Sequence, residues 1–226
     1  MIADRKALVL FASRVVGIFF GLAIITAAAG IAVKSLAPGF DVATLQAIAS
    51  HRSQALTSIA AIVSDAGSFA LLAPISIAFI LLRRWKRPAD DLALAVIAGG
   101  SALLPSLVKL VVARPRPTIE QLRHLATLSF PSEHTTQAAA IYLTIAIMLS
   151  HGLQRGLREA VVVLAVLIAL AVAWSRVYLG VHYPTDVIAG LLLGWSWALL
   201  VYNWARPTLT PHPNPPPQGG KGIPPG

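Results

Sequence analysis

The chain of 226 residues contains no cysteine. Disulfide bonds and metal sites built on thiolates are therefore excluded. Charged residues are also scarce, at 12% of the chain against roughly 25% in an ordinary soluble domain. Because hydrophobic residues make up 56%, this composition indicates a membrane protein.

Acidic residues are the rarer charged class, with nine Asp and Glu against eighteen Lys and Arg. In a soluble protein the resulting net charge of +9 would suggest nucleic-acid binding. In a membrane protein, cytoplasmic anchoring charges and a site for an anion account for the same excess. We therefore expect membrane lipids and an anionic ligand as partners, and no nucleic acid.

Six stretches approach the roughly 20 apolar residues that cross a bilayer as a helix. They are 7–33, 55–82, 92–109, 132–150, 160–179 and 185–205. The sequence thus predicts an all-α polytopic membrane protein, a six-transmembrane-helix bundle formed by one domain over residues 1–206. The first stretch has a competing interpretation as a signal peptide, and its continuation to Val33 favours a retained helix. The Pro- and Gly-rich tail, 207–226, is predicted to be disordered.

Two segments between these stretches add detail. A mixed segment over 34–54 favours a short helix along the membrane interface. Within the second stretch, Pro74 predicts a kink, and Asp65 is expected to be buried, either paired with an arginine of the site or held by a structural hydrogen bond near Gly67.

The densest positive run, over residues 83–87, is expected in the cytoplasm by the positive-inside rule. Six spans then place both termini in the cytoplasm. The polar ends of the last four spans would meet at the opposite, outward face of a bacterial inner membrane.

The residues at these outward ends suit phosphoryl transfer. Lysine and arginine can surround a phosphate and neutralise its oxygens, while a serine before a helix can direct the first amides at the same anion. His182 could attack phosphorus, with Asp186 accepting its other ring N–H. His134 could protonate the leaving oxygen and then activate water. The expected phosphate-binding residues are Lys109, Arg116, Ser132, Glu133 and Arg176.

These residues fall into three motifs: Lys109-x6-Arg116-Pro117, Pro131-Ser132-Glu133-His134, and Ser175-Arg176-x5-His182-x3-Asp186. Their order and spacing resemble the signature of the type 2 phosphatidic acid phosphatase superfamily. The resemblance implies a six-helix membrane enzyme that hydrolyses lipid phosphates without a metal or other cofactor, through a phosphohistidine. It assigns His182 as the nucleophile, Asp186 as its partner and His134 as acid and base. Glu133 stands where the family usually has glycine, which leaves the preferred substrate open.

Three alternatives stand beside this interpretation. His182 and Asp186 have a spacing that helical metal ligands also use, although the surrounding cations would repel a metal ion. A membrane transporter, or a membrane protein that binds lipid phosphates without catalysis, would also place charges near the bilayer.

Arg114 and Arg123 are expected to be outer-loop charges that contact head groups. Phosphatidic acid, phosphatidylglycerophosphate, undecaprenyl diphosphate and a lipid A phosphate all fit as substrates, and the oligomeric state is unassigned.

Overall fold

The computed structural model describes residues 5–83, 86–123, 125 and 127–209. Within these residues the chain forms helices and no strands, which confirms the predicted all-α class. The helices are α1 (Arg5–Leu36), α2 (Pro38–Ala49), α3 (Gln54–Asp65), α4 (Phe69–Leu82), α5 (Pro88–Val112), α6 (Glu133–Leu149), α7 (Arg155–Tyr178) and α8 (Pro184–Leu209). The predicted tail begins inside α8, and its remainder, 210–226, lies outside the described residues.

Four helices in the described part are long and apolar enough to cross a membrane: α1, α5, α7 and α8. The second predicted span is instead two helices, α3 and α4, which pass the same test together but are bent by 47°. The bend lies at residues 66–68, before Pro74, which sits inside α4. The main bend of this span is therefore the break before α4, while a kink at Pro74 stays a prediction. The fourth predicted span corresponds to α6, a helix of 17 residues.

Helix α6 lies at the centre of the bundle and packs against α5, α7 and α8. Its buried residues are mostly small, including Ala138, Ala139 and Ala140, so that neighbouring helices can approach closely. Gly194 of α8 shows how close, because a Cβ there would lie 2.4 Å from the carbonyl oxygen of Thr136. Helix α1 packs against α8 and α5, where Gly30 leaves room for the ring of Phe130.

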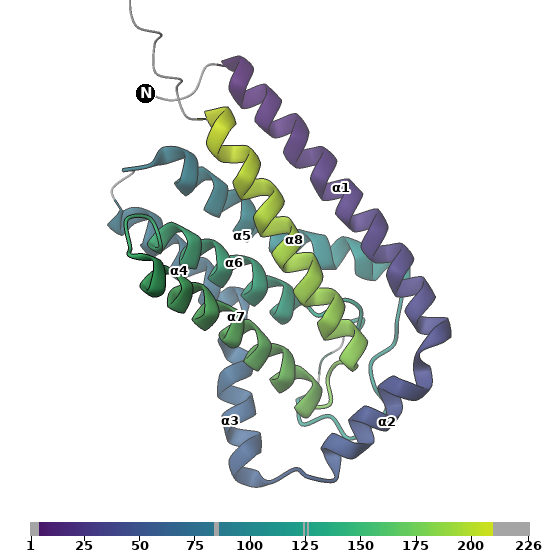
Figure 1. Ribbon diagram of the computed structural model, residues 1–226. Coiled ribbons are helices and arrows are strands. Elements are labelled where there is room, and N and C mark those ends of the chain that lie inside the picture. Colours follow the sequence, from purple (N-terminus) through teal and green to yellow (C-terminus); the bar gives the residue numbers. More distant parts are fainter. Residues whose placement is uncertain (1–4, 84–85, 124, 126, 210–226) are drawn as a thin grey trace, which may run out of the picture.

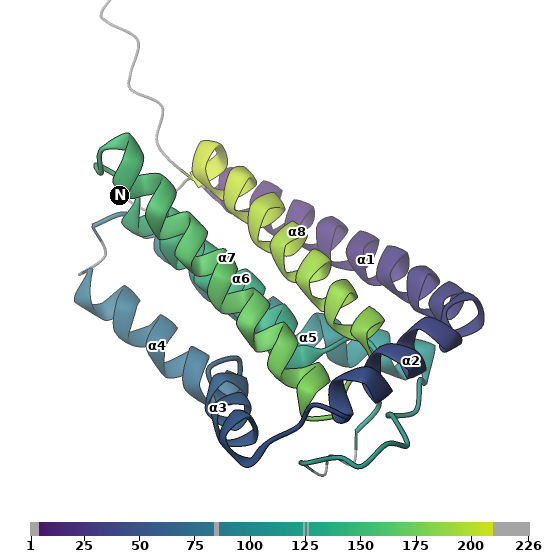
Figure 2. The same cartoon turned by 60° about the horizontal axis from the view of Figure 1, so that its bottom comes forward.

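The two ends of the bundle differ in what they carry (Figure 1). The start of α1, the end of α8 and the α6–α7 connection lie at one end. Helices α2 and α3, together with the junction between α7 and α8, lie at the other. Figure 2 shows α2 crossing the bundle beside the start of α8. The predicted helix within 34–54 is thus present, and it lies at the end where the three motifs meet.

Candidate active site

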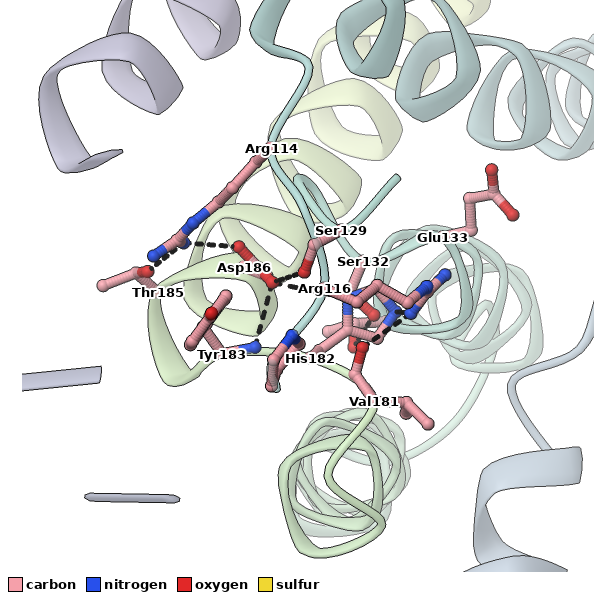
Figure 3. A network of polar contacts seen from close by, with 12 residues as sticks. Arg114, Arg116, Ser129, Ser132, Glu133, Val181, His182, Tyr183, Thr185 and Asp186 are labelled. Carbon is pink, nitrogen blue, oxygen red and sulfur yellow. Dashed lines mark hydrogen bonds and ion pairs between the residues drawn. The ribbon is translucent and has the colours of Figure 1, made fainter. Parts of the chain in front are cut away.

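The predicted site residues come from four helix ends and the segments next to them. Figure 3 labels those around Asp186: Arg116, Ser132, Glu133 and His182. Lys109 is in the last turn of α5, Arg176 is in the last turn of α7, and Asp186 is in the first turn of α8. Ser132 is the N-cap of α6 and is followed by Glu133 and His134. Arg116 and His182 lie in the connections after α5 and α7. The structure therefore brings the three motifs to one end of the bundle.

The side chain of Asp186 is held by three hydrogen bonds. It is fully buried, and its carboxylate accepts hydrogen bonds from Arg114 Nη1 at 2.6 Å, from the Tyr183 amide at 2.9 Å and from the Ser129 hydroxyl. Its backbone carbonyl accepts from the Ser132 amide at 3.1 Å, which joins the start of α8 to the start of α6. The carboxylate is thus fixed from several directions before any ligand binds.

His182 lies between this carboxylate and an arginine. Its Nδ1 is 3.5 Å from Asp186 Oδ2, and its Nε2 is 3.3 Å from Arg116 Nη1. An arginine can only donate, so Nε2 is the acceptor, and the ring proton belongs on Nδ1, facing Asp186. Burial lowers the pKa of His182 to about 4, Asp186 opposes this shift, and Arg176 and Arg116 add to it. The imidazole is therefore neutral near pH 7, with the Nε2 lone pair on the cationic side.

Arg116 is held by the chain rather than by a carboxylate. Its Nε donates to the Thr127 carbonyl at 2.7 Å, its Nη2 to the Thr127 hydroxyl at 2.8 Å, and its Nη1 to the Val181 carbonyl at 2.6 Å. Burial lowers the pKa of Arg116, and the carboxylates of Asp186 and Glu133 oppose that shift. These bonds fix the direction of the guanidinium while leaving its charge available to an anion.

Arg176 is almost fully buried, with 1% of its surface exposed. Its Nη1 donates to the Ser64 hydroxyl at 2.5 Å, while its Nε has no hydrogen-bond partner among the described residues. A buried, unpaired donor on a charged group is costly. The Nε–H of Arg176 is therefore available to a hydrogen-bond acceptor on a bound ligand.

Lys109 and His134 complete the cluster. The ammonium group of Lys109 is 2.8 Å from Glu133 Oε1. His134 interacts electrostatically with both Arg176 and His182, which places the second imidazole on the same side of the site. Gly67, at the break between α3 and α4, makes this arrangement possible, because a Cβ there would lie 2.9 Å from the His134 carbonyl oxygen.

Arg114 is not the outer-loop charge expected from the sequence. It is 5% exposed and lies between two carboxylates, with Nη1 on Asp186 and Nη2 on Asp41, both at 2.6 Å. Burial opposes protonation of Arg114, but the two carboxylates outweigh it and raise its pKa. The hydroxyl and amide of Thr185 also bind Asp41. Helix α2 is thereby connected to the partner of His182.

The sequence analysis missed Asp41 and Ser129. Asp41 stands in the first turn of a helix outside the three motifs, and only its acidic character in an apolar chain could have drawn attention to it. Ser129 lies three residues before Ser132, so its closeness to the second motif was the available signal.

Asp65 also differs from its expected state. Its side chain is 57% exposed and forms an ion pair with Arg123 at 2.5 Å. The carboxylate is therefore not buried, and its partner is the loop arginine that was expected to face head groups. The hydrogen bond to Asp65 raises the pKa of Arg123, and burial opposes this shift.

The described residues contain no group of three or more His, Asp or Glu side chains placed to share a metal ion. The side chains around His182 are mainly cationic donors, which suit an anion.

Comparison with known proteins identifies the family. A model of the PAP2 superfamily matches residues 91–208, about half of the chain. Phosphatidylglycerophosphatase B of Bacillus subtilis is 37% identical over 52% of this chain and 59% of its own length. Undecaprenyl-diphosphatase BcrC of the same organism is 30% identical over 69% of this chain and 78% of its own length.

A solved structure gives the same result for the fold. The crystal structure of a transmembrane PAP2-type phosphatidylglycerolphosphate phosphatase from Bacillus subtilis superimposes with a TM-score of 0.75 and 30% identity. The similarity covers 86% of this chain and 96% of that one, and so includes the helices outside the family motifs. The chain spans less than two thirds of the length of phosphatidylglycerophosphatase B, belongs to the PAP2 superfamily and is an integral membrane protein.

Proposed function

We propose that this protein hydrolyses a lipid phosphomonoester or diphosphate through a phosphohistidine formed on His182, without a metal ion. The observation that carries the proposal is the placement of a neutral His182. Its Nδ1 faces a fixed carboxylate, its Nε2 lies 3.3 Å from Arg116 Nη1, and Arg176 acts on the ring electrostatically. A nucleophile oriented in this way needs no further change of protonation before it attacks.

In the first step the Nε2 lone pair attacks phosphorus, and the bond from phosphorus to the leaving oxygen breaks. His134 gives a proton to that oxygen, which leaves as a lipid alcohol or as a lipid monophosphate. Lys109, Arg116 and Arg176 stabilise the charge on the other phosphate oxygens. Asp186 stabilises the imidazolium character that His182 gains as the bond forms.

In the second step water attacks the phosphohistidine, and His134 accepts the proton of that water. The bond between phosphorus and Nε2 breaks, inorganic phosphate is released, and both histidines return to their initial state. No oxidant, reductant or second substrate is required. Each imidazole thus serves once in each half of the cycle.

The phosphate group must reach a site at one end of a membrane bundle. A lipid phosphate lies at that depth, because its head group stays at the interface while its chains remain in the bilayer. The relatives named as phosphatidylglycerophosphatase and undecaprenyl-diphosphatase support lipids of these two kinds as candidates. We propose that the site faces outward from a bacterial inner membrane, opposite the arginines at the α4–α5 connection.

The test uses purified protein in detergent and a panel of lipid phosphates, with release of inorganic phosphate as the readout. Wild type should release phosphate from at least one lipid, with or without a chelator, and His182→Ala should release none above background. The matched control is His51→Ala, because His51 is an exposed histidine next to α2 at the same end of the bundle. Substrate labelled on phosphorus should give an acid-labile label on wild type and none on His182→Ala.

The alternatives give different results in this experiment. A transporter requires two compartments and would release nothing in detergent. A protein that only binds lipid phosphates would retain the substrate unchanged. Equal phosphate release by wild type and His182→Ala would contradict the phosphohistidine mechanism.

A further inference from the structure

Glu133 places a negative charge inside a site otherwise built for an anion. Its Oε1 lies 2.8 Å from Lys109 Nζ. The lysine side chain is 6% exposed and the glutamate side chain 34% exposed, so the pair sits at the edge of the site rather than in free solvent. One of the three cations expected to bind phosphate is thus already paired within the protein.

The position of Glu133 in α6 also places its negative charge where a phosphate would bind. It is the first residue of the helix, where the free amides and the helix dipole favour a negative charge. The Ser132 hydroxyl does not cap those amides, and instead accepts a hydrogen bond from Thr135. The carboxylate therefore stands at the helix end that an incoming phosphate would also use.

The remaining two cations keep their charge free. Arg116 binds carbonyl and hydroxyl oxygens, and Arg176 binds the Ser64 hydroxyl. Neither forms an ion pair with a carboxylate in the described part of the chain. Glu133 acts on Arg116 electrostatically even without contact. The site thus contains three cations opposed by one carboxylate, in addition to the separately neutralised Asp186.

We propose that Glu133 is a specificity-determining residue that makes the enzyme favour lipid phosphomonoesters over lipid diphosphates. The inference rests on the proposed phosphatase function. The carboxylate repels every negative charge on the ligand, so its penalty increases with the charge of the ligand. A diphosphate carries more ionised oxygens than a monoester, and it therefore loses more affinity at this site. Lys109 reaches the substrate only by leaving Glu133, a cost that both substrates share.

The experiment compares Glu133→Gln and Glu133→Gly with wild type. Phosphatidic acid and a polyprenyl diphosphate are assayed in the same detergent. The ratio of kcat/KM for the diphosphate to that for the monoester should rise about two- to fivefold in both variants, as expected for losing one partly exposed charge interaction. The change should appear mainly in KM and should shrink as salt is added, because salt screens an exposed charge.

The matched control is Glu120→Gln. Glu120 is an exposed carboxylate in the connection that also carries Arg116, and its replacement removes the same charge from the same end of the molecule. Its kcat/KM ratio should stay at the wild-type value. Inorganic phosphate should also inhibit Glu133→Gln more strongly than wild type.

Three outcomes would overturn the proposal. An unchanged ratio with a lower melting temperature would show that Glu133 only stabilises the start of α6. A ratio that falls would show that the carboxylate assists diphosphates. An equal rise in Glu120→Gln would show that the effect is one of overall charge. Absence of phosphate release by wild type would instead contradict the proposed function itself, which keeps the two failures distinguishable.

Discussion

Both ends of the helical bundle contain buried charges, but the two clusters balance them differently. At the end away from the site, Asp91 lies 3.2 Å from Arg83, and Asp90 lies 3.6 Å from both Arg83 and His151. Arg87 approaches Asp90 at 4.0 Å. These pairs tie the end of α4, the start of α5 and the α6–α7 connection together.

At the site end, one part of the cluster is paired at shorter distances, 2.6 Å for each of two ion pairs. Arg114 bridges Asp41 and Asp186, and these three side chains are almost fully buried. The other part is not, because Arg116 and Arg176 have no carboxylate partner among the described residues. Charges that balance each other stabilise a structure, whereas buried charges left without a counter-ion indicate a place for a ligand. The comparison therefore separates a structural cluster from a functional one.

The largest effect on activity is expected for Arg176→Lys in the site cluster, with Arg83→Lys at the other end of the bundle as its matched control. Arg176→Lys keeps the charge but loses the planar fork that can hold phosphate oxygens. We expect kcat/KM to fall about 10²- to 10³-fold, as for the loss of a donor to transition-state charge. Arg83→Lys should leave kcat/KM unchanged. If both variants lost activity equally, the distinction between the clusters would be wrong.

The second effect concerns the paired half of the site cluster. Asp41→Asn removes one of the two carboxylates that hold Arg114, and so loosens the support of Asp186 and His182. Loss of partners that orient a histidine typically costs about 10- to 100-fold in other sites. Because the Asp41 side chain contacts Arg114 and Thr185 rather than the expected phosphate-binding residues, kcat should fall while KM stays close to wild type.

A variant pair checks that this effect passes through Arg114. The double variant Asp41→Asn/Arg114→Gln should lose less than the product of the two single losses, because both disturb one network. Independent, multiplying losses would contradict the proposed connection. Circular dichroism of each variant would confirm that the helices are retained.

The third effect is on stability. Asp91 is fully buried, and Asp91→Asn breaks its pair with Arg83. A loss of about 1–2 kcal/mol would lower Tm by about 2–8 °C in a chain of this size. The matched control, Asp65→Asn, breaks an exposed pair and should change Tm by less. Activity of Asp91→Asn at a temperature well below Tm should equal that of wild type.

Much of the site cluster could be predicted from the sequence. The three motifs carry their residues at helix ends, and alternating spans bring those ends to one face. His182, Arg116 and Asp186 could therefore be expected to meet without knowledge of how the helices pack. The all-α bundle followed from long apolar stretches in the same way.

The residues that support the site could not be predicted. Asp41 and Arg114 are 73 positions apart, and nothing in a single sequence links two such positions. Arg114 resembled a loop charge because it stands in the Arg-Pro-Arg-Pro segment that follows an apolar stretch, and because its burial depends on α2. The break between α3 and α4 was not predicted either. The residues there, 64–68, are polar or small, but the close approach of α6 at Gly67 is a tertiary contact that a single sequence does not show.

The smallest expected effect is a pH dependence of stability that belongs to the site cluster alone. Burial lowers the pKa of His182 to about 4 in the folded protein, against about 6.5 in an unfolded chain. The unfolded state therefore binds more protons between these values, so stability is complete above about pH 6.5 and decreases as pH falls toward 4. Between pH 7.5 and 6 wild type should lose about 0.8 kcal/mol through this residue. His182→Asn should lose less over the same interval, and His51→Asn should retain the wild-type slope, both measured as Tm against pH. A wild-type slope in His182→Asn would show that His182 is protonated as easily in the folded chain as in the unfolded one, and would remove the neutral nucleophile that the mechanism requires.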